Sequence, residues 1–354
     1  MNDSVNEMNA EHTWKHIGLV ILSIRFVQGW IFWGGGSRRF IYDPEKLDPY
    51  SSQWMANKLQ SAMPGAMLGL EQLVSFMLQH FILLYTSIIL FSLVELICGL
   101  NLVFGFFTRV SAFMTALISI ALMLLFGWQG STCMDEWTMA AANLSIGLTL
   151  ALSGGSWLSV DHFLAMRHPA LARKCWFIAL ASGPLSAVRL KQASLVFLTF
   201  SMIFTLLTYN YLRGSVFTPY HSGPVSTGEH HLAIDHVRLQ KNGSLSFNAY
   251  VDAGTPGMPA YIIRIELADL NGSDMETWTG KELSALPAQN IRNYYAYNRI
   301  TTGPYGLVAP LSAKAEIVLP AMTHNTALHS SPYQLRIYTV SGKRFTLEVQ
   351  PSQE

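Results

Sequence analysis

A short polar loop between two apolar runs carries the most reactive side chains of this sequence. Residues 130–140 read GSTCMDEWTMA, in which Cys133 is followed closely by the carboxylates of Asp135 and Glu136. The thiolate is the nucleophilic and oxidisable form of cysteine, so an unpaired Cys133 is a candidate for sulfur redox chemistry. The alternative is that Cys133 packs as a small hydrophobic side chain, because the neighbouring negative charges disfavour a thiolate.

The two carboxylates of this loop stand directly before a long apolar run. A carboxylate at a helix N-terminus is stabilised by the helix dipole, so helix capping is one interpretation of Asp135 and Glu136. A carboxylate in a half-dry site also relays protons in general acid–base chemistry. Both roles remain open for this pair.

Two adjacent arginines, Arg38 and Arg39, follow three glycines at residues 34–36. A guanidinium group suits the oxygens of a sulfonate or phosphate because its N–H groups form a planar fork. Glycines let the backbone approach such an anion closely. The arginines therefore predict an oxyanion site, and the alternative is a pair of interfacial side chains that reach for water.

Arg25 and Glu95 fall inside apolar runs. Intramembrane charges are costly and usually face a partner or a cavity. We expect Arg25 and Glu95 to form an ion pair with each other between the first two helices. The alternative is that Arg25 binds an anionic group while Glu95 holds it or passes protons.

The elements that must position these residues belong to two regimes. Half of the 354 residues are hydrophobic and 13% are charged, whereas about a quarter of an ordinary soluble chain is charged. A spanning helix needs roughly 20 apolar residues. The candidate spans are residues 17–33, 82–104, 110–128, 138–152 and 193–212, while residues 175–188 are predicted to be interfacial or re-entrant.

The distribution of Lys and Arg predicts the topology. Five of these residues lie between the fourth and fifth spans, which places that segment, with Arg109 and Asp161 as anchors and caps, in the cytoplasm. The N-terminus is then inside, and the 130–140 loop and everything after residue 212 are outside. The outer loop 34–80 contains an amphipathic helix that is predicted to begin near Pro64 and lie on the membrane.

The last third of the chain is predicted to be a β-sandwich of six or seven strands. Short runs with partial alternation occur at residues 231–240, 244–251, 260–270, 313–320, 333–340 and 344–350. Turn signals at residues 241–244 and 340–343 are typical of hairpins. The net charge of +1 gives no reason to expect nucleic acid as a partner. The expected class is membrane α + β: a four-helix transmembrane bundle, a fifth transmembrane helix and an Ig-like sandwich outside the cytoplasm.

Several stretches resemble one known family. VELICGLNLVFGFFTRVSAF, residues 94–113, is similar to the DoxX/DoxD four-helix membrane proteins, in which a glutamate helix precedes a Gly-x-x-Thr-Arg turn. GSTCMDEWTMAAANLSIGL and GGSWLSVDHFL continue that likeness. The part from YNYLRGSVFTPYHSGPV to YGLVAPLSAKAEIVLP resembles the DoxA subunit. The whole chain therefore resembles a DoxD–DoxA fusion, with a DoxD-like part at 1–175, a linker at 176–192 and a DoxA-like part at 193–354 (a membrane helix at 193–212 and the sandwich at 213–354).

The resemblance implies a thiosulfate:quinone oxidoreductase of the cytoplasmic membrane. Such an enzyme couples two thiosulfates into tetrathionate, here at the periplasmic face, and passes two electrons to a membrane quinone. No motif for metal, flavin or haem occurs, which favours direct sulfur chemistry at Cys133. The expected roles are catalysis or proton transfer for Cys133, Asp135, Glu136 and Glu95, substrate binding for Arg25, Arg38 and Arg39, and quinone binding for Gln28, Trp30 and Trp137.

Three other functions remain compatible with these residues. The arginines also suit a transporter or binding protein for sulfur oxyanions. The same cysteine suits oxidation of another small thiol compound with quinone. A non-catalytic assembly factor is the third alternative, and homo-oligomerisation is left open.

Overall fold

The structure, a computed structural model, describes residues 12–130, 136–221, 223, 225–240, 244–269, 274–321 and 333–349. The chain divides into two compact units. The helical unit comprises Met1–Met55 and Ile82–Gly223, and the β unit comprises Ala56–Phe81 and Pro224–Glu354. Much of the outer loop, which the sequence assigns to the membrane domain, thus clusters with the β strands.

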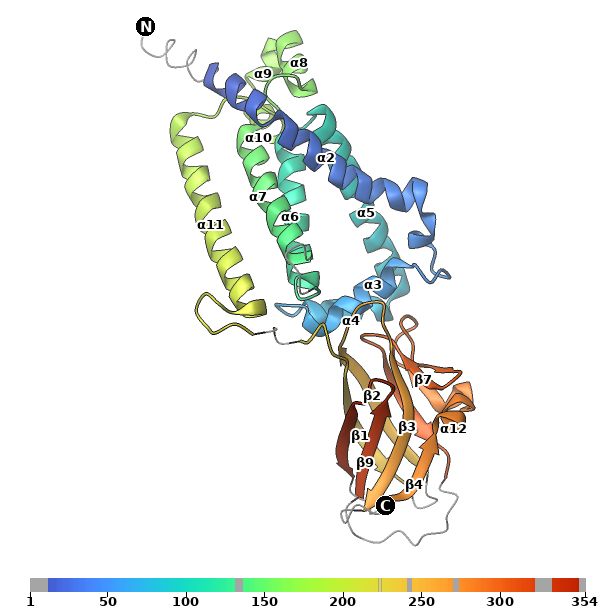
Figure 1. Ribbon diagram of the computed structural model, residues 1–354. Helices are drawn as coiled ribbons and strands as arrows, with labels where there is room; N and C mark the ends of the chain where they lie inside the picture. Colours follow the sequence, from blue (N-terminus) through green and yellow to red (C-terminus); the bar gives the residue numbers. More distant parts are fainter. Residues whose placement is uncertain are drawn as a thin grey trace. The chain divides into compact units, whose positions relative to one another are not determined.

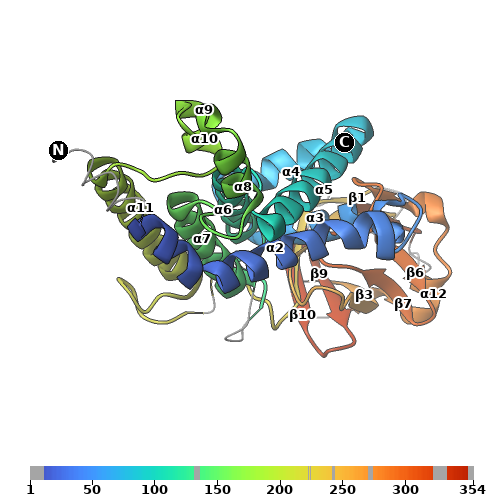
Figure 2. The ribbon, with the colours of Figure 1, turned by 90° about the horizontal axis from the view of Figure 1, so that it is seen from above.

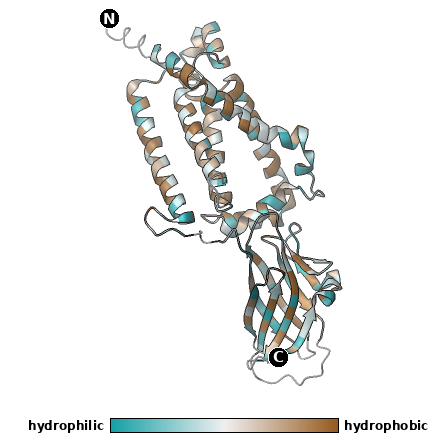
Figure 3. Ribbon diagram, in the orientation of Figure 1, coloured by the Kyte–Doolittle hydropathy of each residue, from teal (hydrophilic) through white to brown (hydrophobic). Residues whose placement is uncertain are grey.

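Three helices of the helical unit are long and apolar enough to cross a membrane. Figure 3 shows the hydrophobic residues that run along them. A fourth span is present if the first two helical segments, which meet at an angle of 54°, count as one. The unit therefore has the character of a multi-pass membrane protein. The three helices are α5 (Phe81–Phe104), α6 (Thr108–Phe126) and α11 (Ala187–Arg213), and the bent pair is His12–Val20 with Leu22–Tyr42.

The five apolar runs expected from the sequence are all helical, but two of them differ from simple spans. The first is bent, and α2 (Leu22–Ser37) forms its second part. The fourth is α7 (Glu136–Ser153), which has 18 residues and is not among the helices that are apolar enough by themselves. Polar residues such as Asn143 lower the hydropathy of α7. The helix packs against α6, α11 and α2, so part of its surface faces protein rather than lipid.

Helices α6 and α7 pack closely along their length and lie side by side in Figures 1 and 2. A Cβ on Gly147 would lie 2.9 Å from the carbonyl oxygen of Ala112, so only glycine permits this approach. Buried side chains from both helices, together with Phe197 and Phe204 of α11, form a shared core. Its buried members are Ala116, Met123, Ala140, Leu144 and Leu148.

Short helices connect α7 to α11. The run at residues 175–188, expected to be interfacial or re-entrant, contains one helix of six residues followed by irregular chain. That length is far too short to span a bilayer. The connecting helices are α8 (Val160–Arg167), α9 (Pro169–Ala172) and α10 (Cys175–Leu180).

The β unit contains two antiparallel sheets. One has the strand order β1-β2-β8-β5, and the other has the order β10-β9-β3-β7-β6 with β4 also paired to β3. Alternate residues of β2, β8 and β9 are buried, as in strands that face a shared core. The strands are β1 (His231–Leu239), β2 (Leu245–Ala253), β3 (Ala260–Asp269), β4 (Asp274–Thr279), β5 (Ile291–Asn293), β6 (Thr301–Gly303), β7 (Gly306–Ala309), β8 (Lys314–Leu319), β9 (Tyr333–Thr339) and β10 (Arg344–Val349).

The six strands expected from alternation are all present, and the hairpin between β9 and β10 forms at the expected turn. Gly342 has a φ of +79° there, a conformation that favours glycine. Strands β4 to β7 were not expected. Three of them have only three or four residues, and β4 and β7 share one edge of β3, each covering part of it. Such short strands form through hydrogen bonds to neighbouring strands and are too short to show an alternating pattern in the sequence. The expected count of six or seven strands is therefore too low.

The amphipathic segment of the outer loop forms α3 (Met55–Ala62), a 3-10 turn at Met63–Gly65 and α4 (Leu70–Gln79). The long helix begins at Leu70 rather than near Pro64. Within the β unit it contacts the part of the chain that carries the strands, because Ser75 Oγ lies 2.8 Å from Tyr295 Oη. Upstream, the Gln60 side chain donates to the Ser312 carbonyl at 2.9 Å. One face of the segment is thus held by the β unit, while Leu73 and Phe76 stay exposed.

Candidate functional site

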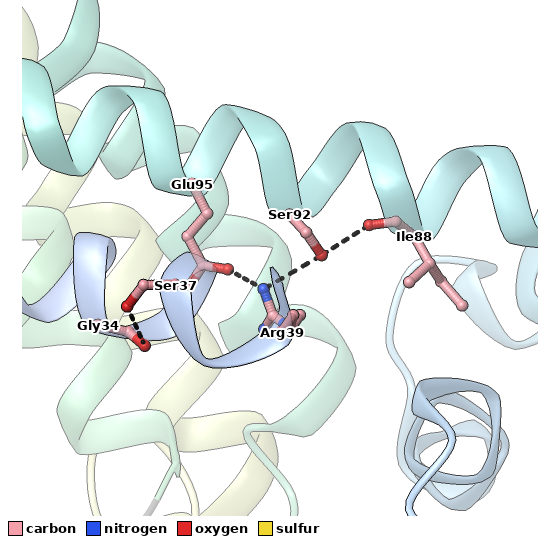
Figure 4. Close-up of polar contacts among 6 residues, drawn as sticks. All are labelled: Gly34, Ser37, Arg39, Ile88, Ser92 and Glu95. Atoms are coloured by element: carbon pink, nitrogen blue, oxygen red, sulfur yellow. Dashed lines mark hydrogen bonds and ion pairs between the residues drawn. The ribbon is translucent and has the colours of Figure 1, made fainter. Parts of the chain in front are cut away.

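The central polar feature of the helical unit is an ion pair between Arg39 and Glu95 (Figure 4). The guanidinium Nη1 also lies 3.4 Å from Ser92 Oγ, and its carbon lies 5.5 Å from the centre of the Phe91 ring. The two side chains are only 13% and 11% exposed. Desolvated charges of this kind interact strongly but depend on each other.

Glu95 lies well inside a spanning helix. At 1.5 Å per residue it stands about 21 Å from the Phe81 end of α5 and about 14 Å from the Phe104 end. An ionisable group at such a depth is costly and is usually functional. The pair is therefore the strongest candidate for chemistry within the membrane.

A π-helical turn presents Arg39 to this position. Helix α2 continues beyond Ser37 as a five-residue π-helix, Arg38–Tyr42, in which the Asp43 amide donates to the Arg38 carbonyl at 2.5 Å. A π-turn holds more residues than an α-turn, changes the direction of the following side chains, and is often found at functional sites. The two adjacent arginines consequently differ: Arg39 is partly buried in the ion pair, whereas Arg38 is exposed.

Two of the three glycines before the arginines let α2 approach α5. A Cβ on Gly36 would lie 2.6 Å from the backbone nitrogen of Leu96, and one on Gly35 would lie 2.4 Å from Glu95 Oε1. A Cβ on Gly34 would meet nothing within 4 Å. Two of the glycines thus serve the contact with α5, while the third faces open space.

The guanidinium of Arg38 makes no hydrogen bond or ion pair with any residue in the part of the chain that the structure describes. It is the arginine whose guanidinium remains available for an anion. Arg39 already has Glu95 as a partner. The two arginines expected to form one oxyanion site therefore have different environments: Arg38 is exposed, and Arg39 is paired with Glu95.

The expected ion pair between Arg25 and Glu95 is wrong. Arg25 donates to the carbonyl oxygens of Gly155 at 2.5 Å and Leu158 at 2.7 Å, in the turn after α7. It lies near the end of α5, because a Cβ on Gly105 would be 3.0 Å from its Nη1. Glu95 stands roughly 14 Å further along that helix, so the two side chains occupy different levels.

Gln28 and Trp30 lie on different sides of α2. Gln28 is fully buried, and its Nε2 donates to the Asn143 carbonyl at 3.2 Å and to Thr115 Oγ1 at 3.3 Å. Its Oε1 has no hydrogen-bond partner among the described residues. Trp30 is 55% exposed, and its ring contacts that of Trp33 at a tilt of 36°, with 4.8 Å between the ring centres. Residues two apart on a helix do not face each other, so these two side chains serve separate environments.

Cys133 and Asp135 lie outside the described residues. Glu136 is the first residue of α7. Trp137 follows it, and its indole donates to Thr208 Oγ1 at 3.0 Å while its ring meets Tyr209 edge to face at 5.2 Å. Trp137 thereby joins the start of α7 to the end of α11.

A second buried polar centre surrounds Asp161, which is completely inaccessible to solvent. Its carboxylate accepts hydrogen bonds from the Phe107 and Thr108 amides at 2.8 and 3.0 Å, and so caps α6 as expected. The hydroxyls of Thr108 and Ser182 donate to it at 2.8 and 3.0 Å. Arg109 binds carbonyls of the same region, among them that of Gly183 at 2.7 Å. This convergence was not expected from the sequence.

Sequence reasoning missed Phe91 and Ser92 as neighbours of Arg39. Ser92 stands one turn before Glu95 on α5, so its spacing was the available signal. As for metal ligands, no three His, Cys, Asp or Glu side chains come together within the ranges that the structure describes.

Two family models match the chain in succession. Residues 20–198, half of its length, match DoxD, described as a TQO small subunit, and residues 225–348 match DoxA, also described as a TQO small subunit. The first match covers the helices that carry the Arg39–Glu95 pair, and the second covers nearly all of the strands. The chain therefore belongs to the DoxD family and joins DoxD to DoxA in a single polypeptide of the TQO oxidoreductase type.

Proposed function

We propose that this protein is a thiosulfate:quinone oxidoreductase that forms tetrathionate at the outer face of the cytoplasmic membrane. The membership in two TQO subunit families supports the reaction class. The observation that carries the assignment to this chain's own residues is the Arg39–Glu95 pair, buried within apolar helices beside the exposed Arg38. In this proposal the N-terminus faces the cytoplasm and the β unit lies outside.

The substrate is a dianion, so its recognition requires uncompensated positive charge. Arg38 supplies a guanidinium that is free among the described residues, and the fork of N–H groups matches sulfonate oxygens. Arg39 adds positive potential but is largely neutralised by Glu95. Arg25, which is held by two backbone carbonyls, is the least available of the three proposed substrate arginines.

The sulfur chemistry is proposed to run through Cys133. Its thiolate and one thiosulfate lose two electrons and form the disulfide-like adduct Cys–S–S–SO₃⁻. The sulfane sulfur of that adduct is then attacked by a second thiosulfate, which releases tetrathionate and restores the thiolate by exchange at sulfur. The two electrons reduce one quinone, which is a substrate and not a resident group.

Formation of quinol requires two protons. Glu95 is a largely buried carboxylate that pairs with Arg39, and it is proposed as a proton group within the membrane. Asp135 and Glu136 are proposed as further proton groups at the start of α7. The quinone ring is proposed to reach the site from the lipid along α2, where Trp30 is exposed, with Gln28 and Trp137 as further contacts.

The test is quinone reduction by the purified full chain in detergent. Thiosulfate should drive loss of the quinone absorbance, with one tetrathionate formed per quinone reduced and two thiosulfates consumed. Cys133→Ser should abolish turnover, while Cys175→Ser, at an exposed cysteine, should retain it.

Three results would contradict the proposal or one of its parts. Thiosulfate uptake into proteoliposomes without quinone reduction would establish a transporter instead. Full turnover by Cys133→Ser would remove the covalent sulfur step while leaving the overall reaction in place. Reduction by another small thiol compound in place of thiosulfate would reassign the substrate.

A further inference from the structure

A cavity of about 680 Å³ lies at the end of the helical unit where α6 and α11 begin. It is lined by α8, by the chain before α11 and by Trp14, and none of its lining residues belongs to the Arg39–Glu95 site. Ser182 and Asp161 lie at its buried side. The cavity is therefore a separate feature that the proposed oxidoreductase reaction leaves unused.

The cavity carries an uncompensated positive charge. Arg173 lines it, and its guanidinium makes no hydrogen bond or ion pair with the residues whose positions are described. Asp161 is the one acidic residue in its lining, and that carboxylate already accepts hydrogen bonds from Phe107, Thr108 and Ser182. The segment that encloses the cavity is basic and contains no acidic residue between 162 and 228: its cations include Arg167, Arg173, Lys174, Arg189 and Lys191.

The rest of the lining is apolar. Met166, Ile178 and Leu185 contribute hydrophobic surface beside Trp14. A ligand that matches both parts has an anionic group for Arg173 and a hydrocarbon portion for these side chains. A small inorganic anion would satisfy only the first part.

The cavity also lies at the ends of spanning helices. Asp161 caps the first turn of α6, and Ser186, the N-cap of α11, lines the cavity and accepts from the Arg189 amide at 3.4 Å. The ends of spanning helices stand at the level of the lipid headgroups. An anion beside Ser186 also gains from the positive end of the α11 dipole.

We propose that this cavity binds the phosphate headgroup of an anionic phospholipid, with Arg173 as the principal cation. The first part of an acyl chain would lie along Ile178 and Leu185. The site would make the helical unit sensitive to the anionic lipid content of its membrane, independently of the oxidoreductase reaction.

The test uses the purified full chain in a neutral detergent, delipidated and then supplied with defined lipids. Native mass spectrometry and thermal unfolding should show binding of phosphatidylglycerol in preference to phosphatidylcholine with the same acyl chains. Arg173→Gln should weaken phosphatidylglycerol binding about tenfold, as expected for loss of one charged hydrogen bond. Arg167→Gln removes a charge from the same basic segment but not from the cavity lining, so it should change binding less than threefold.

A second variant tests the cavity itself without changing charge. Ala165→Phe places a large side chain in the lining and should weaken phosphatidylglycerol binding in the same manner as Arg173→Gln. Equal weakening by Arg167→Gln and Arg173→Gln would overturn the site in favour of a diffuse basic surface. Equal stabilisation by inorganic phosphate or by phosphatidylcholine would overturn the anionic phospholipid as the ligand.

Discussion

The ion pair between Arg39 and Glu95 makes a prediction about stability and activity together. The side chains are 13% and 11% exposed, so removal of either partner leaves a charge stranded among apolar helices. Each of Arg39→Gln and Glu95→Gln should cost about 3–5 kcal/mol of the free energy of unfolding. The double variant removes both charges, so it should be more stable than either single variant.

Thermal unfolding in detergent measures the first part of this prediction. Arg38→Gln is the matched control, because the neighbouring arginine is exposed and should change stability by less than about 0.5 kcal/mol. Equal stability of both single variants and the wild type, or simple additivity in the double variant, would refute the coupling of the two charges.

Thiosulfate-dependent quinone reduction measures the second part. If Glu95 moves protons, the double variant recovers stability but remains without turnover. If the pair only holds α2 against α5, the double variant recovers both. Arg38→Gln should leave stability unchanged and raise the KM for thiosulfate, since its guanidinium is proposed to bind the dianion. Full turnover by the double variant would therefore exclude Glu95 as a proton group.

Four other substitutions have outcomes that follow from local geometry. Gly36→Ala places a methyl group against the backbone of α5 and should destabilise the helical unit by about 1–3 kcal/mol, whereas Gly34→Ala, with open space around it, should be neutral or stabilising by up to about 1 kcal/mol in the same unfolding experiment. Asp161→Ala should cost about 3–5 kcal/mol, because buried donors lose their acceptor and the nearby Arg25 and Arg109 lose a negative charge; unchanged unfolding would show that the carboxylate is dispensable. Hydrogen bonds from the backbone amide and then the hydroxyl of Thr279 lower the pKa of Glu282, so its stabilisation is complete above the unfolded-state pKa and is lost as pH falls through the lower folded-state value. The advantage of the wild type over Glu282→Gln in thermal unfolding of the β unit should thus shrink on acidification below about pH 4.5, and a constant advantage would contradict the assignment.

Much of the secondary structure follows from local pattern. The five runs expected to span the membrane are helical because a long uninterrupted run of hydrophobic residues has few other ways to satisfy its backbone in an apolar setting. Strands β1, β2, β3, β8, β9 and β10 follow from the partial alternation of their sequences, and in β2, β8 and β9 alternate residues are buried. The short strands β5, β6 and β7 have too few residues to show a period, and they exist because longer neighbours offer them hydrogen bonds.

The role of the outer loop was less accessible to local reasoning. Its amphipathic pattern predicts a helix, and α4 is that helix. The pattern does not distinguish a lipid surface from a protein surface, because both accept an apolar face. The hydrogen bond between Ser75 and Tyr295 joins residues 220 positions apart, and no local signal identifies such a partner.

For the site, the sequence by itself identified Arg25 and Glu95 as expensive to bury, because both fall inside apolar runs, while Arg39 and Asp161 lie just beyond the ends of such runs. Only the tertiary structure decided which of them meet. The π-turn after Ser37 and the close approach at Gly35 and Gly36 bring Arg39 to Glu95, and the turn after α7 binds Arg25 instead. The physical reason is that the cost of desolvating a charge can be read from the apolar residues around it in the sequence. The partner that offsets this cost lies on another helix, and the packing of the whole unit decides where two helices cross.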